Sequence, residues 1–274
     1  MKCRLCESEN IKFVFNYSGK DIYAQKLGLS DFKLAWYSCA DCGVFFSIQP
    51  ENIESVYSDK NLYDAQYTLP QIKERFEKIM QLPPAKSDNS FRVKRVKSFY
   101  KRYLKLTKPK NKHCKILDIG AGMGVFLAKF PEKIYQRYAL ELNPVACEHL
   151  KNTLNIEVFS KPVEEINNLF FNLITLNKVV EHLQNPFSIM FSLRTALETN
   201  GIIYIELPDT IGYEQEGATC DAFACGHYFV YNSQSLQFLL QKSGFEILCL
   251  DRILEPSGKY SIFAFARRSE NEVL

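Results

Sequence analysis

The chain has 274 residues, of which 46% are apolar and 24% charged, and its formal net charge is +3. This length suggests one large or two modest domains, and the near-neutral charge excludes an acidic disordered tail or a histone-like polycation. The longest apolar runs, such as residues 202–205 and 262–266, are too short for a membrane span of about 20 residues. The first residues, MKCRLCESEN, lack the apolar stretch of a signal peptide. We therefore expect a cytoplasmic protein whose thiols stay reduced.

Four of the nine cysteines form two CxxC pairs near the start of the chain. Cys3 and Cys6 make the first pair, and Cys39 and Cys42 make the second. In a reducing compartment, two such pairs predict a tetrahedral zinc site with four thiolate ligands. Because four protein ligands leave no open position, we expect this zinc to be structural. A redox pair or unligated cysteines are the alternatives, and the matching spacing of the two pairs disfavours them.

Residues 1–50 are predicted to be a small zinc-binding module with strands at 11–17, 33–38 and 44–48. So short a segment buries little apolar surface, so the metal would supply much of its stability.

Residues 51–87 are predicted to be an aromatic linker or lid. They contain Tyr57, Tyr63 and Tyr67, followed by a helix over 71–81 that the prolines at 83 and 84 end. We predict that Tyr63 contacts a substrate, and packing between domains is the alternative role for these tyrosines.

A second helix is predicted over residues 91–106, after polar capping residues at 87–90. Residues 91–115 hold eleven lysines and arginines and no acidic residue. Because the repeating apolar positions form one buried face, we expect these charges to lie on the other face. They either stay solvated or guide a phosphorylated or nucleotide-linked substrate electrostatically.

From residue 115 onward, strands and helices alternate. This order predicts a doubly wound α/β domain over residues 88–268, built on a seven-stranded, mostly parallel sheet. The last two strands follow each other without a helix, which predicts an antiparallel hairpin at one edge. The expected strands are 116–119, 138–142, 156–159, 173–176, 201–207, 246–251 and 260–267, and the expected helices are 125–130, 145–153, 186–197 and 233–243.

The clearest motif is KILDIGAGMG at residues 115–124, where a strand runs into Gly120, Gly122 and Gly124 before the next expected helix. Glycines at these points let the backbone turn tightly and approach a ligand without a β-carbon in the way. The dinucleotide pattern needs its third glycine at the sixth position of the loop, which here is Val125. The spacing therefore favours S-adenosylmethionine over NAD.

Acidic residues flank this loop in the way that such a cofactor requires. Asp118 ends the preceding strand, where it can orient the loop or reach the amino group of the methionine part through water. Glu141 ends the next strand, where its carboxylate can accept hydrogen bonds from both ribose hydroxyls. We predict that Asp118, Glu141 and the adjacent Leu142 bind the cofactor.

Four segments in order, LDIGAGMG, ALELNP, FFNLITLNKVVEHLQNP and GIIYIELP, resemble the successive motifs of class I S-adenosylmethionine-dependent methyltransferases. The resemblance extends to three further segments, CRLC…CADCGVFF, VYSDKNLY and GHYFVYNSQSL. With these segments, the chain is similar to zinc-knuckle methyltransferases, which include sugar C-methyltransferases and enzymes of surface-glycan and antibiotic clusters. The resemblance implies that the three loop glycines, Glu141 and Asn177 bind the cofactor, and that His227 lies over the substrate. It also implies a Rossmann-like fold and a sugar-linked acceptor.

Two departures from this group favour O-methylation over C-methylation. The chain ends at residue 274 without the further C-terminal domain of the long sugar C-methyltransferases, and Gly226 stands where they tend to have Glu. We therefore expect a small hydroxylated acceptor: a sugar, a nucleotide sugar or a surface-glycan intermediate.

Methylating a hydroxyl requires removal of its proton, and histidine is well suited to that task. His182 follows the fourth strand of the sheet and His227 lies in an aromatic loop after the fifth, so both are predicted catalytic residues. Either one could instead be a hydrogen-bonded histidine that holds its loop. Asp209, after the fifth strand, is a predicted substrate contact. His113 and His149 are expected at the surface or satisfied in the core.

Two other functions stay open at this point. One is an RNA methyltransferase that uses the zinc module and the basic helix on phosphates, although the near-neutral charge counts against it. The other is a non-catalytic scaffold that binds the cofactor and docks partners through zinc. The sequence makes no prediction of the oligomeric state.

Overall fold

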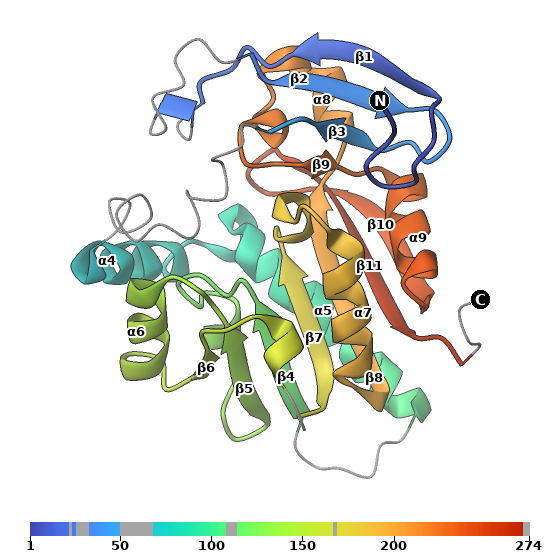
Figure 1. The fold of residues 1–274 in the computed structure, drawn as a ribbon. Helices are drawn as coiled ribbons and strands as arrows, with labels where there is room; N and C mark the ends of the chain where they lie inside the picture. Colours follow the sequence, from blue (N-terminus) through green and yellow to red (C-terminus); the bar gives the residue numbers. More distant parts are fainter. Residues whose placement is uncertain (22–23, 26–32, 50–67, 108–113, 167–168, 271–274) are drawn as a thin grey trace.

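The computed structural model describes residues 1–21, 24–25, 33–49, 68–107, 114–166 and 169–270. Its larger sheet has seven strands (Figure 1), and the predicted α/β fold with a mostly parallel sheet is confirmed. Five neighbouring strands of this sheet pair in parallel. The last strand of the chain, Tyr260–Arg268, is antiparallel to both of its neighbours, as expected for the hairpin. The order across the sheet is β10 (Phe245–Leu254), β11 (Tyr260–Arg268), β8 (Leu197–Pro208), β7 (Phe171–Asn177), β4 (Cys114–Ile119), β5 (Tyr135–Leu140) and β6 (Glu157–Phe159).

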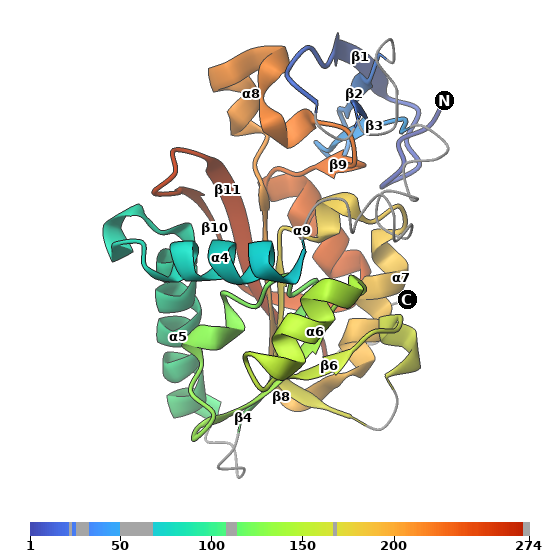
Figure 2. The same ribbon diagram turned by 90° about the vertical axis from the view of Figure 1, so that its left-hand side faces the viewer.

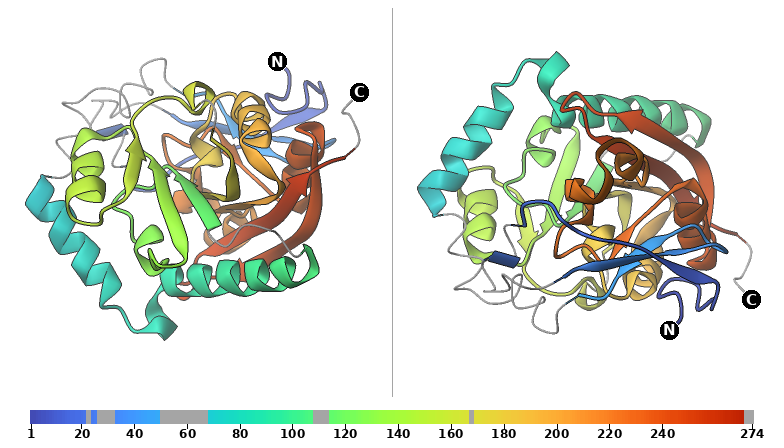
Figure 3. Two further views of the ribbon diagram at one scale, coloured as in Figure 1. Left: turned by 90° about the horizontal axis from the view of Figure 1, so that it is seen from below. Right: turned by 90° about the horizontal axis from the view of Figure 1, so that it is seen from above.

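Helices cover both faces of this sheet (Figures 2 and 3). Successive side chains of a strand point to opposite faces, so Ile116 packs in a core with α5 (Asp88–Thr107), while the next residue, Leu117, packs in a core with α7 (Pro186–Thr195) and α9 (Ser233–Lys242). α6 (Pro144–Asn152) contributes Leu150 to the α5 side. α4 (Leu69–Met80), the helix predicted from the second segment, packs against α6.

The prediction of a helix over residues 125–130 is wrong. Only one 3₁₀ turn forms there, Leu127–Lys129, because Pro131 ends a segment too short for a stable α-helix. The short helix α8 (Ile211–Glu216) and strand β9 (Phe229–Val230) were not predicted.

The expectation that the charges of the basic helix all face away from the core is also wrong for two of them. Arg92 and Arg95 of α5 both turn inward to Glu206 on β8, which is fully buried. Arg95 reaches a carboxylate oxygen of Glu206 at 2.5 Å, and Tyr204 donates a hydrogen bond to the same oxygen at 2.5 Å. Apolar periodicity predicted the buried face of α5. It gave no indication that Glu206 would pair with the guanidinium groups of Arg92 and Arg95.

The N-terminal segment forms a second sheet, in the order β1 (Ile11–Asn16), β2 (Ala35–Cys39), β3 (Phe45–Ser47) and β9. Its last strand comes from the far half of the chain, since Phe46 pairs with Phe229 and Phe45 with Val230. The fully buried Trp36 donates a hydrogen bond to the carbonyl oxygen of Phe223 at 2.8 Å. The segment predicted as a zinc-binding module therefore shares both a sheet and a core with the larger domain.

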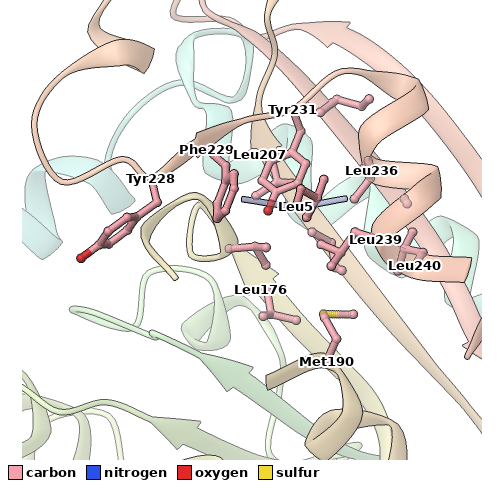
Figure 4. Packing of buried hydrophobic residues seen from close by; sticks show 14 of the residues in the cluster. Leu5, Leu176, Met190, Leu207, Tyr228, Phe229, Tyr231, Leu236, Leu239 and Leu240 are labelled. Atoms are coloured by element: carbon pink, nitrogen blue, oxygen red, sulfur yellow. The ribbon is translucent and has the colours of Figure 1, made fainter. Parts of the chain in front are cut away.

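Figure 4 shows this shared core at close range. Leu5, between the first two cysteines, lies in one cluster with Leu176 and Leu207 from the large sheet and with Leu236 from α9. The linker residue Tyr63 lies outside the described residues, so its predicted substrate contact stays a prediction. In the described ranges, none of the helices has the length and apolar character that a membrane crossing requires.

Candidate active site and metal site

The four N-terminal cysteines come together as predicted. The sulfur of Cys3 lies 3.7 Å from that of Cys42, the sulfur of Cys6 lies 3.5 Å from that of Cys39, and all four lie within 4.8 Å of one another. Four thiolates that converge in this way match the donor set of a structural zinc site.

The two cysteine turns have the same backbone conformation. In the second turn, Gly43 has a φ of 75° and donates a hydrogen bond to the carbonyl oxygen of Cys39 at 2.9 Å. In the first turn, Glu7 has a φ of 61° and donates to the carbonyl oxygen of Cys3 at 2.9 Å. The sequence did not predict the conformation of Glu7, because a left-handed conformation at glutamate has no sequence signal. The two turns therefore present four cysteine sulfurs that suit tetrahedral coordination of one metal ion.

The three loop glycines after β4 all have positive φ, but they meet different surroundings. A β-carbon on Gly120 would lie 2.8 Å from Val179, and one on Gly124 would lie 2.5 Å from Leu150. A β-carbon on Gly122 would meet nothing within 4 Å. The outer two glycines therefore serve close packing of the loop, and Gly122 borders open space in which a ligand can approach the backbone.

Glu141 lies at the carboxyl end of β5, directly beside this loop. One carboxylate oxygen accepts a hydrogen bond from the backbone N–H of Gly122 at 2.7 Å. The other accepts from the N–H groups of Leu142 at 2.9 Å and Asn143 at 2.8 Å. These contacts fix the orientation of a carboxylate that still has acceptor capacity for hydroxyl groups. The side chain of Leu142 is 57% exposed and offers an apolar surface next to it.

Asp118 is buried at the end of β4 and anchors the neighbouring strand. Its Oδ1 accepts hydrogen bonds from Thr175 Oγ1 at 2.6 Å and from Asn177 Nδ2 at 2.8 Å. Burial disfavours its charged form and raises the pKa of Asp118 to about 7. The structure thus brings together the predicted cofactor residues Asp118, Glu141, Asn177 and the loop glycines. Open space at Gly122, a fixed carboxylate and an adjacent apolar surface fit the adenosyl part of S-adenosylmethionine.

His182 and His227 come from distant parts of the chain and meet at the carboxyl end of the sheet. Their ring centroids lie 4.5 Å apart, with an interplanar angle of 72°. Nδ1 of His227 lies 2.6 Å from the carbonyl oxygen of Ala222, and Nδ1 of His182 lies 3.0 Å from that of Gly226. A carbonyl oxygen can only accept, so each Nδ1 carries the proton when the ring is neutral. Burial lowers the pKa of His227 to about 3.

Both histidines line a cavity of about 700 Å³. The cavity reaches the glycine loop at Val125, whose carbonyl oxygen accepts a hydrogen bond from Asn89 at 2.8 Å. Predicted substrate contact Asp209 also lines it, but the carboxylate of Asp209 is held by the N–H of Ile211 at 3.1 Å and by Arg252 at 2.9 Å. Charged residues of both signs complete the wall, namely Lys20, Lys86, Asp88, Arg92, Lys178, Glu181, Glu216, Asp221 and Lys259.

Glu181 gives this wall a third candidate metal ligand beside the two histidines, with its ligand atom within 4.8 Å of theirs. One of its carboxylate oxygens is buried and has no hydrogen-bond partner among the described residues. Burial raises the pKa of this carboxyl group, and the nearby His182 and Lys178 offset the shift only in part.

His149 does not line the cavity. His149 is fully buried against Phe76 of α4, and neither of its ring nitrogens has a hydrogen-bond partner among the described residues. Neither a surface position nor a satisfied core position, as expected from the sequence, describes it. His113 lies outside the described residues.

Comparison with known proteins agrees with this geometry. A family model described as "Methyltransferase domain" matches residues 89–250, so the chain belongs to this methyltransferase family. A search of curated proteins finds no match.

Many solved structures share the fold. The 1,6-didemethyltoxoflavin-N1-methyltransferase of Burkholderia thailandensis, solved with its substrate and S-adenosylhomocysteine, has a TM-score of 0.55 and 15% identity, covering 94% of this chain and 100% of its own. An S-adenosylmethionine-dependent methyltransferase from Aquifex aeolicus has a TM-score of 0.49 and 15% identity, covering 73% and 98%. The glycopeptide N-methyltransferase MtfA with S-adenosylmethionine has a TM-score of 0.47 and 15% identity, covering 62% and 93%. The protein is an S-adenosylmethionine-dependent methyltransferase.

Proposed function

We propose that this enzyme methylates a hydroxyl oxygen of a small acceptor: a sugar, a nucleotide sugar or a surface-glycan intermediate. The observation that carries the proposal is the cavity that both His182 and His227 line and that extends to Val125, the residue directly after the last loop glycine. Its volume lies in the range of about 300–1,000 Å³ that is usual for small-molecule sites. Charged side chains of both signs in its wall suit an acceptor with many hydroxyl groups and a phosphate.

The cofactor residues in this proposal are Asp118, the loop glycines, Glu141, Leu142 and Asn177. When bound, S-adenosylmethionine supplies a methyl group already activated by the sulfonium charge. The fixed carboxylate of Glu141 is placed to accept hydrogen bonds from the ribose hydroxyls. We further assign a structural zinc ion to the four cysteines and a cytoplasmic location, in which their thiols stay reduced.

His227 is the base that we assign to the reaction. With the proton on Nδ1 directed to the carbonyl oxygen of Ala222, Nε2 has the lone pair that accepts the proton of the acceptor hydroxyl. Burial lowers the pKa of His227, which keeps the ring neutral at physiological pH and also makes it a weaker base than an exposed imidazole. His182, in edge contact with this ring, is the second catalytic candidate. Gly226 stands where the sugar C-methyltransferases tend to have Glu, and the lack of that side chain favours a hydroxyl acceptor over a carbon acid.

Nothing in the described residues favours the RNA or scaffold alternatives. Arg92 and Arg95, two of the charges that an RNA site on α5 would need, are already paired with the buried Glu206. The cavity between a base and a cofactor loop would have no use in a scaffold.

The first test is calorimetric titration with S-adenosylmethionine, followed by a thermal-shift screen of nucleotide sugars. We expect one binding site for the cofactor and a raised melting temperature with the nucleotide sugar that serves as acceptor. Heat with NAD but none with S-adenosylmethionine would refute the cofactor assignment, and a shift with RNA alone would favour the RNA alternative.

Replacement of the base tests its role directly. The substitution His227→Ala should lower turnover by about 100-fold or more, which is the usual share of general base catalysis, and should leave the affinity for S-adenosylmethionine unchanged. The measurement is a methyl-transfer assay on the acceptor that the screen identifies. Full activity of His227→Ala would remove this residue as the base, and loss of activity in His182→Ala instead would transfer the role to His182.

A further inference from the structure

The loop at residues 225–228, which carries His227 over the cavity, is held in place although it contains almost no regular structure. Only the strand that follows it, β9, is paired. Gly226 has a φ of 96°, so the chain makes a left-handed turn directly before the histidine. A loop with such freedom needs outside contacts if it is to fix a ring within the fraction of an ångström that catalysis demands.

One set of contacts comes from the turn after β7. The N–H of Tyr228 donates to the carbonyl oxygen of Glu181 at 2.8 Å, and Nδ1 of His182 donates to the carbonyl oxygen of Gly226 at 3.0 Å. These two bonds hold the loop from the methyltransferase side.

The other set comes from the cysteine-containing N-terminal segment. The side chain of Gln49 accepts a hydrogen bond from the N–H of Gly226 at 3.0 Å and donates one to the carbonyl oxygen of His227 at 2.6 Å. Ser47, fully buried at the end of β3, donates its hydroxyl to the same carbonyl oxygen at 2.8 Å, and its own N–H donates to the carbonyl oxygen of Tyr228 at 3.1 Å. Gln49 thus binds the peptide group that precedes Gly226 and the peptide group that follows His227.

We infer that Gln49, supported by Ser47, is a positioning residue for the base, and that holding the His227 loop is a task of the N-terminal segment in catalysis. The inference rests on the proposed function of His227. An amide is suited to this position because the loop offers one N–H and one carbonyl oxygen, and glutamine has one acceptor and one donor end. Glutamate would keep the acceptor and lose the donor, and alanine would lose both.

The chain offers a matched control in Gln234. This exposed residue of α9 also bridges the two parts of the molecule, since its side chain donates to the carbonyl oxygen of Asp41 at 2.7 Å. Among the described residues, its side chain makes no hydrogen bond to the His227 loop. A general loosening of the interface would affect Gln49→Ala and Gln234→Ala alike, whereas a positioning role affects only the former.

The test reads the imidazole rings by NMR, because the full chain contains only four histidines. In ¹⁵N-labelled Gln49→Ala and Gln49→Glu, we expect the ring signals of His227 to move away from the single Nδ1-protonated form and those of His149 to stay. In Gln234→Ala, all ring signals should stay. If Gln49→Ala does not fold, the nearly isosteric Gln49→Glu still gives the answer. Unchanged His227 signals in a folded Gln49 variant would overturn the inference.

Turnover provides the second readout. We expect Gln49→Ala to lower kcat by roughly 10- to 100-fold, the effect of a small misplacement of a reacting group, with an unchanged Kd for S-adenosylmethionine and with Gln234→Ala close to the unmodified enzyme. A loss of kcat of the same size in both variants would contradict the inference. Absence of cofactor binding by the unmodified protein would instead refute the proposed function, and the ring signals would still report on the positioning role.

Discussion

Each glycine of the cofactor loop has a distinct physical role. At Gly120 and Gly124 the surroundings leave no room for a β-carbon. Gly122 borders open space, and glycine suits this position because of its φ of 54° and because a ligand can approach the backbone there. A side chain at Gly122 would project into the open space that we assign to the cofactor. The three positions therefore predict different outcomes of substitution.

We expect Gly122→Val to abolish measurable S-adenosylmethionine binding by calorimetry while the protein stays folded. The strained backbone should cost about 1–3 kcal/mol of stability, which a thermal melt would register. Gly124→Ala should lower the melting temperature more than Gly122→Val does, and should weaken S-adenosylmethionine binding less, because its β-carbon collides with Leu150 and Leu154. Unaltered affinity in Gly122→Val would contradict the placement of the cofactor at this loop.

Asp118 predicts how cofactor affinity changes with pH. Its pKa of about 7 means that the unliganded protein carries a mixture of the neutral and charged forms near neutrality. A cationic ligand nearby favours the charged form, so the affinity for S-adenosylmethionine should rise between about pH 6 and pH 8 as the proton is lost. Calorimetry across this range measures the effect. In Asp118→Asn the dependence should vanish, and an unchanged slope in that variant would assign the titration to another group.

The same shift has a consequence for the stability of the unliganded protein. The folded pKa of Asp118 lies above the value of about 3.9 in an unfolded chain, so its carboxyl group favours folding at low pH. This contribution is lost as the pH rises through about 7. His227, with its lowered pKa, contributes in the opposite direction and loses its share as the pH falls below about 6.5.

At the scale of single residues, the sequence predicted those residues that belong to a short motif with a recognisable spacing. The glycines, Asp118, Glu141 and the four cysteines each belong to a motif of a few neighbouring residues. Gln49 and Glu7 escaped notice because their roles depend on contacts or conformations that no local pattern encodes. For Gln49, the partner loop lies more than a hundred residues along the chain.

Among the elements, α5 and β8 are joined by ion pairs that are out of reach of pattern analysis. Glu206 is fully buried and binds two guanidinium groups, and Arg92 and Lys178 counteract the burial and hold its pKa below the usual range. Helix periodicity predicted α5 almost to its ends, yet it treated every arginine as solvated. The strand pattern of β8 likewise gave no sign that Glu206 would be satisfied inside the protein.

Removing Glu206 should therefore be costly. Glu206→Ala leaves Arg92 and Arg95 without their partner in a largely buried position, and we expect a loss of about 3–5 kcal/mol in the free energy of unfolding. The exposed pair of Arg267 and Glu246, 2.8 Å apart, serves as the control, and Glu246→Ala should cost at most about 1 kcal/mol. Denaturant titration compares the two. Equal costs would show that the buried pairs do not stabilise the fold.

At the scale of the whole molecule, zinc is expected to stabilise the part of the structure that supports the base. Metal analysis should find one zinc ion per chain, and a strong chelator should remove it and lower the melting temperature. Because β3 follows the cysteines and pairs with β9, chelation should also disturb the ring signals of His227. The cofactor loop lies on the large sheet, so S-adenosylmethionine binding should persist. A purified protein without metal would refute the four-cysteine site.

The division of the chain at residues 50 and 88 followed local signals in the sequence, namely the cysteine pairs, the tyrosine-rich stretch and the start of the strand–helix alternation. Such signals cannot show that a strand of one segment completes the sheet of another. β9 lies deep within the second predicted domain along the chain but completes the sheet of the first. Its two residues, Phe229 and Val230, are buried and apolar, which is equally typical of a strand in the large sheet. Only the three-dimensional pairing with Phe45 and Phe46 decides between the two sheets.

This exchanged strand limits how the protein can be engineered. A chimaera that grafts the first fifty residues of another homologue onto this catalytic half must also supply a matching partner for Phe229 and Val230, or the transplanted piece will have an unpaired sheet border. Exchanging N-terminal segments between such enzymes is therefore feasible only when the two paired strands, β3 and β9, are transferred together.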